Sequence, residues 1–374
     1  MKKVVFIVSK LSQPRCIKRI QSIIEAGNDC RVYGFEDGSY NTDLTKLPFN
    51  IEEVLTTPRR NGKRIVNSIV GRVYPYYKLR RILSKEGSNS IYYVFGFDLA
   101  KILYRLGCKN FIYEEADINS SKYSSKIKRL LSIRLDKKIA LRSLLTVYTS
   151  KGFVDFLFKE SKKPNFLVLP NKLSSYFANH ERDRIKSEID INKLRFGFIG
   201  LIRYPETIFR FAKVVSNHFP MYEFHFYGGK AASLTIPEEL QRSGNVFFHG
   251  PFSNPEDLED IYKAIDINIA CYDTLSQKNA TNVKVAEPNK LYESIYFKTP
   301  LIVSQGTYVG ERVSSMGIGK AVDSTDENSI LSFIKSLTIE RLNQMVLNAE
   351  RISKNDLIDN PNELTDRIYM LVQE

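Results

Sequence analysis

The sequence predicts an α/β protein made of two Rossmann-like domains that face each other across a cleft. The chain has 374 residues, which is more than one hydrophobic core usually fills. In each half, short apolar runs alternate with helical patterns, as in parallel sheets that carry helices on both faces. A polar, charged segment at 180–192 separates the halves and is typical of a linker. We expect an N-terminal domain over 1–180, a C-terminal domain over 190–350, and a helical tail over 351–374 that packs back on the N-terminal domain.

The first half begins with a strand and a helix. The apolar run 3–9 predicts a buried strand, and Ser12, Gln13 and Pro14 then provide an N-cap and a proline near the first helical position. Apolar residues follow at helical spacing as far as Gly27, where we expect the helix to end. The further elements expected in this half are strands at 30–35, 91–95, 110–113, 145–149 and 166–171, and a helix at 99–106.

The second half repeats this order of strands and helices. Because a strand followed by a helix recurs along the chain, this half can also form its own parallel sheet. Its expected elements are strands at 194–200, 222–227, 246–250, 265–271 and 300–304, and helices at 205–217, 256–264 and 289–297.

The composition indicates a protein of the cytoplasm. Apolar residues make up 43% of the chain, which is ample for packed cores. No run of about eighteen apolar residues is present to span a membrane, and the run 4–8 is too short for the apolar region of a signal peptide. The four cysteines are scattered and form no CxxC pair, as expected for free thiols in a reducing compartment.

The positive charge is concentrated in the first half. Residues 1–180 carry 33 Lys and Arg against 15 Asp and Glu, a net charge of +18, whereas residues 181–374 carry 22 against 27, a net charge of −5. The basic stretches 59–64, 78–85 and 126–142 are interleaved with apolar residues, and basic helices of this kind can lie on anionic lipid. We therefore expect peripheral contact with the inner face of an anionic membrane. A solvated basic face is the alternative, and no nucleic-acid-binding module is recognisable.

One loop of the second half suits a phosphate-bearing ligand. In doubly wound sheets, ligands bind beyond the carboxyl ends of the strands. The strand at 194–200 ends in Gly200, and the following loop presents Arg203 just before a helix. Unpaired N–H groups at a helix start and a guanidinium group together suit a diphosphate. The loop lacks the GxGxxG pattern of dinucleotide-binding proteins, and a surface arginine at a strand–helix turn is the alternative interpretation.

A second loop opens the helix at 289–297. Pro288 and Asn289 mark its start, so Lys290 lies in the first turn, where a cation opposes the helix dipole. We therefore expect Lys290 to face an anion, such as a donor diphosphate. Glu293, one turn later, could accept hydrogen bonds from both hydroxyls of a ribose. Solvated charges on an amphipathic helix are the alternative.

Three carboxylates follow the expected strand at 110–113. They are Glu114, Glu115 and Asp117, and carboxylates that cluster at a strand end can raise one another's pKa. Such a group could act as a base, contact sugar hydroxyls, or stabilise a developing oxocarbenium ion. An acidic cluster that only stabilises the first turn of the next helix is the alternative.

We expect no metal and no cofactor. The chain contains no Asp-x-Asp pattern, and its four histidines show no ligand spacing. The charge of a leaving diphosphate must then be met by helix ends and by Arg and Lys side chains. His249 precedes Gly250 at a strand end, where it is structural or lines the donor pocket.

These residues fall in motifs of a known family. The Pro288-Asn289-Lys290-Leu291-Tyr292-Glu293 segment with Thr299-Pro300 resembles the donor domain of family-4-type GT-B glycosyltransferases, particularly those that build bacterial surface polysaccharides. Shorter matches in the same domain are Phe248-His249-Gly250, 257–262 through Asp266, and Tyr272-Asp273. The Ser12-Gln13-Pro14-Arg15 and Glu114-Glu115-Ala116-Asp117 stretches look like parts of the acceptor domain of such enzymes.

The resemblance implies the GT-B fold, with an acceptor-binding first domain and a donor-binding second domain. It implies a metal-independent, hexosyltransferase-like glycosyltransferase that retains the anomeric configuration of the sugar. The donor would be a nucleoside-diphosphate sugar, and the acceptor a glycan or a lipid-linked molecule. The products would serve surface polysaccharide or glycoconjugate synthesis.

The resemblance also implies roles for individual residues. In the family, the glutamate matching Glu293 binds the nucleotide ribose, and basic residues matching Arg203 and Lys290 lie near the diphosphate. The complete set of expected site residues is donor-binding Gly200, Arg203, Asn289, Lys290, Leu291 and Glu293, acceptor-binding Arg15, and the catalytic candidates Glu114 and Asp117.

The sequence departs from the family pattern at two points. Many members carry two glutamates with seven residues between them, but the residue eight places before Glu293 is Val285, and Glu287 lies two places later. A sugar-contacting role for Glu287 therefore stays open. Of the basic pair often found after the first donor-domain strand, only Arg203 is present, which leaves Lys290 as the second cation. A sugar-nucleotide epimerase of the same fold and a non-enzymatic polyanion-binding protein are the alternative functions.

Overall fold

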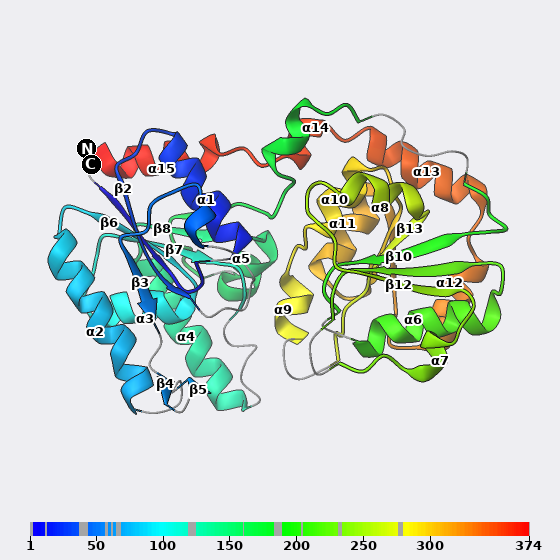
Figure 1. The fold of residues 1–374 in the computed structure, drawn as a ribbon, viewed down its shortest axis with the longest axis horizontal. Coiled ribbons are helices and arrows are strands. Elements are labelled where there is room, and N and C mark those ends of the chain that lie inside the picture. The colour runs from blue at the N-terminus through cyan, green and yellow to red at the C-terminus, as the bar shows by residue number, and fades with distance from the viewer. Residues whose placement is uncertain are drawn as a thin grey trace. The chain divides into compact units, whose positions relative to one another are not determined.

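The computed structural model divides the chain into two compact units (Figure 1). Unit 1 comprises Met1–Leu169 together with Asn360–Glu374, and unit 2 comprises Pro170–Asp359. Each unit is a parallel sheet with helices on both faces, which is the Rossmann-like arrangement that the alternation of strands and helices predicts (Figure 1). The structure describes residues 3–11, 13–36, 44–56, 59–60, 63–64, 69–118, 125–159, 161–182, 189–202, 205–230, 234–275 and 280–373.

Unit 1 is built on seven parallel strands in the order β3-β2-β1-β6-β7-β8-β9. The central strands are buried along their whole length because helices cover both faces, which explains their nearly continuous apolar sequences. The strands are β1 (Val4–Val8), β2 (Cys30–Glu36), β3 (Glu53–Thr56), β6 (Ile91–Phe95), β7 (Phe111–Glu115), β8 (Leu145–Tyr148) and β9 (Phe166–Val168). A separate antiparallel ribbon pairs β4 (Arg59–Arg60) with β5 (Lys63–Arg64).

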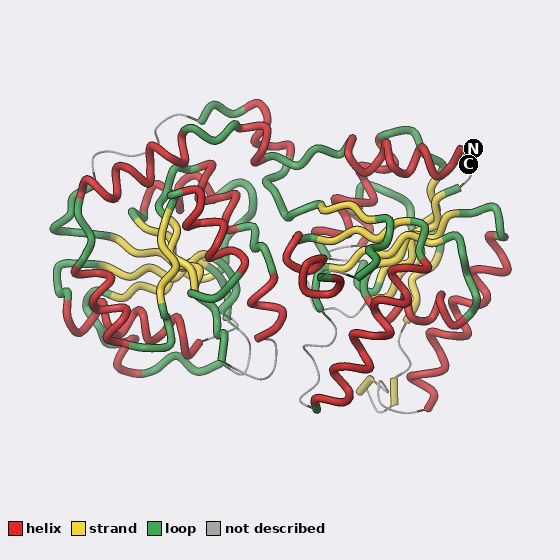
Figure 2. The backbone as a smooth tube through the Cα atoms, turned by 180° about the vertical axis from the view of Figure 1, so that it is seen from behind, coloured by secondary structure: helices red, strands yellow, loops and turns green. Residues whose placement is uncertain are grey.

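The first and last helices of the chain cover one face of this sheet. Apolar residues of α1 (Pro14–Glu25) join Leu364 and Ile368 of α15 (Asn362–Gln373) in one core with alternate residues of β1. The opposite face is covered by α4 (Lys126–Arg142), and the tube view shows this two-sided cover from behind (Figure 2). The remaining helices of unit 1 are α2 (Ile69–Glu86), α3 (Phe97–Arg105) and α5 (Lys151–Phe158).

Unit 2 is built on six parallel strands in the order β12-β11-β10-β13-β14-β15. The strands are β10 (Arg195–Ile199), β11 (Glu223–Tyr227), β12 (Val246–Gly250), β13 (Ile267–Ala270), β14 (Leu301–Ser304) and β15 (Gly319–Val322). One apolar core includes residues of α6 (Pro205–His218), α7 (Glu238–Gln241), α12 (Glu327–Lys335) and α13 (Ile339–Glu350). A second core includes residues of α8 (Leu258–Ala264), α10 (Lys290–Tyr296), α11 (Tyr308–Met316) and α14 (Lys354–Leu357), and α9 (Ala280–Val285) precedes α10.

The boundary between the units lies earlier than the polar segment 180–192 suggests. Leu173 and Phe177 are buried in a core of unit 2, and Leu173 forms a parallel bridge with Ile358. The chain therefore enters unit 2 after Leu169 and leaves it after Asp359. The tail expected from residue 351 is likewise divided, since α14 belongs to unit 2 and α15 to unit 1. Polarity misplaced the boundary because the linking segments are fastened by a few apolar anchors.

One expected helix start agrees with the structure, and one expected strand end does not. The N-cap of α1 is Gln13, from the expected segment 12–14, with Pro14 as the first helical residue, although the Gln13 side chain makes no capping bond. Ser12 lies outside the described residues. Glu114 and Glu115 were expected to follow a strand, but they are the last two residues of β7 and are fully buried. Their charge suggested a loop, whereas buried partners allow the strand to continue.

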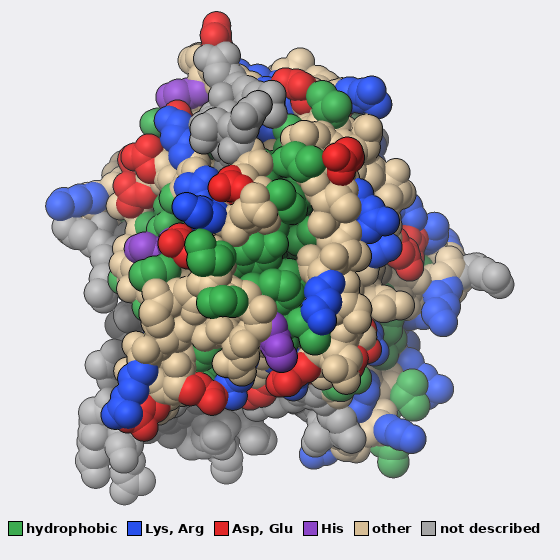
Figure 3. All heavy atoms as spheres, turned by 90° about the vertical axis from the view of Figure 1, so that its right-hand side faces the viewer, with side chains coloured by type: hydrophobic (Ala, Val, Ile, Leu, Met, Phe, Trp, Pro, Cys, Tyr) green, Lys and Arg blue, Asp and Glu red, His purple; other side chains and the backbone are tan. Residues whose placement is uncertain are grey.

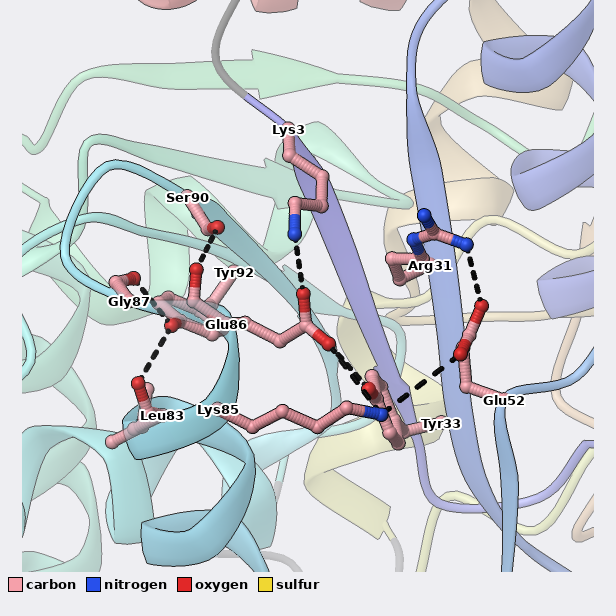
Figure 4. A network of polar contacts seen from close by, with 10 residues as sticks. All are labelled: Lys3, Arg31, Tyr33, Glu52, Leu83, Lys85, Glu86, Gly87, Ser90 and Tyr92. Atoms are coloured by element: carbon pink, nitrogen blue, oxygen red, sulfur yellow. Dashed lines mark hydrogen bonds and ion pairs between the residues drawn. The ribbon is translucent and has the colours of Figure 1, made fainter.

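A buried carboxylate fastens α2 to the amino-terminal end of the first sheet (Figure 4). Glu86 is 4% exposed and accepts a hydrogen bond from Lys3 Nζ at 2.7 Å and another from the Tyr33 hydroxyl. Lys85 Nζ lies 4.0 Å from the same carboxylate. Because Lys3 immediately precedes β1, this network lies at the strand ends opposite to those where ligands bind in such folds.

The described helices include none that is long and apolar enough to cross a membrane. On the face drawn in Figure 3, apolar side chains gather near the centre, and acidic and basic side chains are interspersed around them.

Candidate functional site

Three glycines form the carboxyl edge of the second sheet. Gly200 follows β10, Gly228 follows β11, and Gly250 ends β12, with φ angles of +133°, +129° and +80°. The Gly228 N–H donates to the Gly250 carbonyl at 2.7 Å, and a Cβ on Gly228 would collide with the Gly200 carbonyl oxygen. The backbones can approach this closely only without side chains. This edge of the sheet therefore presents backbone without side chains. We call Gly200, Gly228 and Gly250 together the glycine floor.

Lys290 lies beside this floor. A Cβ on Gly200 would be 3.6 Å from Lys290 Cε, so two of the expected donor residues are neighbours in space. Lys290 is the first residue of α10, is 7% exposed, and places Nζ 2.9 Å from Glu293 Oε2. The structure thus brings Gly200, Lys290 and Glu293 together. Arg203, the other expected cation, lies outside the described residues.

The Glu293 carboxylate already has several donors. Asn289 Nδ2 donates to Oε1 at 2.5 Å, and the Tyr262 hydroxyl donates to Oε2 at 3.1 Å, alongside Lys290. Asn268 Nδ2 in turn donates to the Tyr262 hydroxyl at 3.1 Å. Tyr262 and Asn268 were not expected from the sequence as site residues, although Tyr262 ends the 257–262 stretch that resembles the family and Asn268 follows Asp266. Through these hydrogen bonds, Tyr262 and Asn268 fix the position of the Glu293 carboxylate.

The structure bears on the roles predicted for Lys290 and Leu291. The charge of Lys290, which was expected to need an external anion, is met by Glu293, and α10 has only seven residues. Leu291 is completely buried in the core of unit 2, so its side chain packs rather than faces a ligand. Asn289, in contrast, belongs to the hydrogen-bond network, because its side-chain amide donates to Glu293.

Glu287 is occupied by other side chains. It accepts a hydrogen bond from the Tyr292 hydroxyl and lies 3.3 Å from Arg312 Nη1, and its side chain is 1% exposed. Burial raises the pKa of Tyr292, and the neighbouring Glu287 raises it further. Glu287 therefore joins α10 to α11. Its position in the sequence, two places after the residue where the family carries its first glutamate, does not predict this contact.

A pocket of about 350 Å³ opens at the carboxyl ends of β11 and β12. It is lined by Tyr227, His249, Gly250, Pro251, Phe252, Asp257, Asp260 and Ile261. The rings of Tyr227 and His249 stack with centroids 4.2 Å apart and planes within 6°. His249 thus lines a pocket beside the glycine floor, which is one of the two positions expected for it.

In unit 1, Glu114 and Glu115 point to opposite faces of the sheet, as neighbouring strand residues do. Glu114 faces α1: Arg19 Nε lies 3.3 Å from Oε2, Arg15 Nε lies 3.3 Å from Oε1, and the Tyr93 hydroxyl donates at 2.5 Å. Glu114 is completely buried. Arg15, the second residue of α1, keeps 19% of its side chain exposed beside this pair.

Glu115 faces α4, where it is buried beside Asp136. Burial raises the pKa of Glu115 well above that of an ordinary carboxyl, and the adjacent Asp136 raises it further. The expected carboxylate cluster is therefore divided. The main acidic neighbour of Glu115 comes from a helix rather than from Glu114, and Asp117 is exposed beyond the strand end.

Comparison with known proteins shows the fold. No protein-family model and no curated protein sequence matches the chain. HepE from Anabaena, solved in complex with UDP and glucose, matches with a TM-score of 0.68 and 14% identity over 100% of both chains. WaaG, a glycosyltransferase involved in lipopolysaccharide biosynthesis, matches with a TM-score of 0.64 and 13% identity over 97% of this chain and 98% of its own. A UDP-GlcNAc 2-epimerase from Neisseria meningitidis, bound to UDP-GlcNAc, matches with a TM-score of 0.60 and 14% identity over 100% and 99%. The chain has the GT-B fold.

Proposed function

We propose that this protein is a glycosyltransferase that moves a sugar, in our interpretation a hexose, from a nucleoside-diphosphate donor to a glycan or lipid-linked acceptor. The observation that carries the proposal is the network of Asn289, Lys290 and Glu293 beside a bare glycine floor and next to a pocket. Solved proteins of the same fold include a UDP and glucose complex and a transferase of lipopolysaccharide synthesis. We infer a role in surface polysaccharide or glycoconjugate synthesis, with retention of the anomeric configuration.

The donor would exchange partners with this network. A carboxylate accepts about four hydrogen bonds and does not distinguish amide, ammonium and hydroxyl donors. Ribose hydroxyls can therefore take the places of Asn289 and Lys290 as donors to Glu293. Lys290 would then turn to the diphosphate and, with Arg203, stabilise the charge that develops on the leaving group. Gly200 would allow the phosphates to approach the backbone closely.

In unit 1, we propose that Arg15 binds the acceptor and that Asp117 is the catalytic carboxylate. Asp117 is exposed beyond the end of β7, where it could contact sugar hydroxyls or stabilise an oxocarbenium ion. Glu114, completely buried between Arg15 and Arg19, would act by positioning Arg15. Of the two catalytic candidates, Asp117 is therefore the one we place in contact with substrate.

Replacing Glu293 tests the donor site. The Glu293→Gln variant keeps the shape of the side chain but loses charge-assisted bonds of about 1.5–3 kcal/mol each, so donor affinity should fall about 10- to 150-fold. The matched control is Glu259→Gln on α8, whose carboxylate forms an exposed pair with Lys263. Isothermal titration with the UDP- or GDP-sugar that best stabilises the protein measures both. Equal affinity of Glu293→Gln and wild type would refute the assignment.

We further propose that catalysis needs no divalent metal. Lys290, Arg203 and the backbone N–H groups of the edge would supply the positive potential that a metal otherwise provides. Sugar transfer should therefore continue within about twofold after treatment with EDTA. A complete loss that magnesium or manganese restores would contradict this.

An epimerase is the second candidate, because a UDP-GlcNAc 2-epimerase shares the fold. An epimerase converts its sugar nucleotide without an acceptor. Incubation of the protein with the binding sugar nucleotide alone, followed by NMR of the sugar protons, separates the two functions. A new sugar epimer would favour the second candidate.

We also propose peripheral contact of unit 1 with an anionic membrane. Three apolar side chains in the first turns of α4 are mostly exposed, Ile127 at 71% and Leu130 and Leu131 at 57% each. Lys126 and Lys128 are exposed beside them. Apolar groups between cations suit the boundary of an anionic bilayer.

A further inference from the structure

A chain of three side chains crosses β11 and β12 next to the pocket, where Glu223 and His225 are half-buried and His249 is exposed. Glu223 and His225 lie two residues apart on β11, and His249 lies on the neighbouring strand β12. His225 Nε2 is 3.0 Å from Glu223 Oε2, and His225 Nδ1 is 3.0 Å from His249 Nε2. We call these three residues the histidine relay.

The relay fixes where the protons are. A carboxylate only accepts hydrogen bonds, so Nε2 of His225 must carry a hydrogen. Nδ1 of a neutral His225 is then an acceptor, and His249 must donate to it through its own Nε2–H. Neutral His249 is left with Nδ1 as an acceptor.

Aromatic neighbours hold both rings in place. His225 stacks on Phe247 with centroids 5.0 Å apart, and His249 stacks on Tyr227 at 4.2 Å. Burial lowers the pKa of both histidines below 6.5, which favours the neutral relay near pH 7. The stacking fixes the direction in which His249 can hydrogen-bond.

The other charged groups near the relay do not supply a donor to the pocket. Arg195 on β10 also lowers the pKa of His225, but its guanidinium is paired with Asp266 at 2.9 Å. Asp257 and Asp260, which line the pocket, present carboxylates, and Asp257 accepts a hydrogen bond from the Ser253 N–H at 2.7 Å. Among the described lining residues, Asp257 and Asp260 therefore only accept hydrogen bonds, the Tyr227 hydroxyl can donate or accept, and the free ring nitrogen of neutral His249 accepts.

A fixed ring acceptor on His249, beside the aromatic ring of Tyr227, favours a particular kind of base. Uracil and guanine carry an N–H at the ring nitrogen of their Watson–Crick edge, whereas cytosine and adenine carry a lone pair there. His249 is exposed, and a base stacked in the pocket would cover it. A lone pair of that base facing His249 Nδ1 would leave two acceptors without a proton between them, and polar groups left unpaired when a ligand covers them give strong selectivity.

We propose that His249, oriented by Glu223 and His225, selects donors whose base presents a ring N–H, so that the substrates are uridine or guanosine diphosphate sugars. This deepens the proposed function and rests on it, since the pocket adjoins the glycine floor assigned to the diphosphate. His249 contacts the base, and Glu223 and His225 are positioning residues that act through it.

Two pairs of variants test the relay. An Asn amide oxygen can occupy the position of a histidine Nδ1, whereas a Gln amide extends to the position of Nε2. His249→Asn should therefore keep the preference for a ring N–H, and His249→Gln should lose it. His225→Phe should keep the stacking on Phe247 but remove the acceptor that orients His249, whereas Glu259→Gln on α8 is the control that should change nothing.

The measurement is the affinity of the full chain for UDP, GDP, CDP and ADP at pH 7.5 by isothermal titration. For wild type we expect UDP or GDP to bind at least tenfold more tightly than CDP and ADP. The preference should fall to about twofold or less in His249→Gln and His225→Phe. It should also fall in wild type as the pH is lowered through the depressed pKa of His249, because protonated His249 has only donors, but not in His249→Asn.

Each outcome is decisive. If CDP or ADP binds wild type as tightly as UDP and GDP, or if His249→Gln keeps the wild-type preference, the inference is wrong. If the preference disappears equally in His249→Asn and His249→Gln, stacking rather than the acceptor is responsible, and the inference is also wrong. If no nucleoside diphosphate binds, the proposed function fails together with the inference. If Glu293→Gln weakens binding while the relay variants leave selectivity intact, only the inference fails.

Discussion

At the scale of single residues, the partners of a carboxylate decide what it can do. Glu287 and Glu114 are buried and held by arginine and tyrosine side chains, so each joins elements of the fold. Glu293 is equally buried, but its partners Asn289 and Lys290 stand at the start of a helix beside a bare backbone edge. Because these partners can turn toward a ligand, Glu293 is the buried glutamate best suited to exchange.

The buried pair of Glu115 and Asp136 should make the stability of unit 1 depend on pH. Burial raises the pKa of both carboxyls above their ordinary values of 4.5 and 3.8. Their protonated forms are therefore favoured in the folded state, and this contribution to stability is complete below about pH 4 and is lost as pH rises through the raised pKa values. Between pH 5 and pH 8 the wild type should become less stable.

The Glu115→Gln variant removes one titrating group and keeps its size, so its unfolding midpoint should vary less with pH. A raised pKa corresponds to about 1.4 kcal/mol per unit, so the difference between variant and wild type should change by about 1–3 kcal/mol between pH 5 and pH 8. Denaturant titrations at several pH values measure it. Asp155→Asn, which removes an exposed carboxylate of α5 paired with Lys151, is the control. Identical pH profiles for Glu115→Gln and wild type would count against the buried pair.

At the scale of elements, α10 is held at both ends. Its first turn carries the hydrogen-bond network of Glu293 that we propose as the donor site, and its last turn is bound by Arg182, whose guanidinium donates to the carbonyls of Ile295 and Tyr296. The same guanidinium donates to Ala349 and Ile352 near the end of α13. A cation at two helix ends is favourable because helix C-termini carry negative potential. Arg182 thus joins the segment that enters unit 2 to the helix that presents Lys290.

Replacing Arg182 should therefore affect both stability and donor binding. Loss of several charge-assisted hydrogen bonds at a half-buried site should lower the unfolding free energy of unit 2 by about 2–4 kcal/mol. Donor affinity should also fall several-fold, because the start of α10 loses its support. Arg182→Lys keeps the charge but not the planar fork that reaches several carbonyls, so it should behave like Arg182→Ala. Full recovery in Arg182→Lys would show that charge alone suffices.

The elements themselves were largely predictable, and the contacts between them were not. β6 and β12 occur at the residues expected. β6 is buried on both faces and therefore reads as a continuous apolar run, whereas β12, with exposed residues on one face, is marked by its aromatic residues and by Gly250 at its end. The pairing of Glu115 with Asp136 and of His225 with His249 joins residues more than twenty positions apart, which no local pattern encodes. Arg182 reaches carbonyls more than a hundred residues away. Charge at the end of β7 also misled the prediction, because buried partners were invisible in the sequence.

At the scale of the whole molecule, the uneven charge has a structural counterpart in unit 1. The ribbon of β4 and β5, made of four basic residues, lies between the first turns of α2 and α4 in both ribbon views (Figures 1 and 2). On α2, Tyr77 is 61% exposed and shares a groove with Arg80 and Arg81. At the end of the unit where the ribbon lies, the first turns of α4 present the exposed apolar side chains of Ile127, Leu130 and Leu131 beside exposed Lys126 and Lys128.

This end should bind anionic vesicles. Each Lys or Arg near such a surface contributes about 1 kcal/mol, falling away within a Debye length, so binding should be reversible and weaker in high salt. Neutralising Lys126, Lys128 and Arg134 should weaken binding at low salt, whereas Leu130→Ser with Leu131→Ser should remove the part that survives salt. Sedimentation with anionic and neutral vesicles measures both.

The control for the vesicle experiment is a pair of exposed cations in unit 2, Arg242→Gln with Lys263→Gln, which should bind as the wild type does. Equal binding of wild type to anionic and neutral vesicles, or no binding to either, would reject the membrane proposal. The basic end would then serve the anionic acceptor alone.

The chain passes from unit 1 into unit 2 and then back to unit 1, and this path sets the order in which the units are completed during synthesis. Unit 2 is one continuous stretch, and its entering and leaving segments are joined by the bridge between Leu173 and Ile358. Unit 1 lacks α15 until unit 2 has been made, although Leu364 and Ile368 complete the core around β1. Domains generally fold as units during synthesis, the first to emerge folding first. Here the domain that begins first is completed last, and the nascent chain must protect an open apolar face of its own N-terminal sheet while the whole of unit 2 is being made.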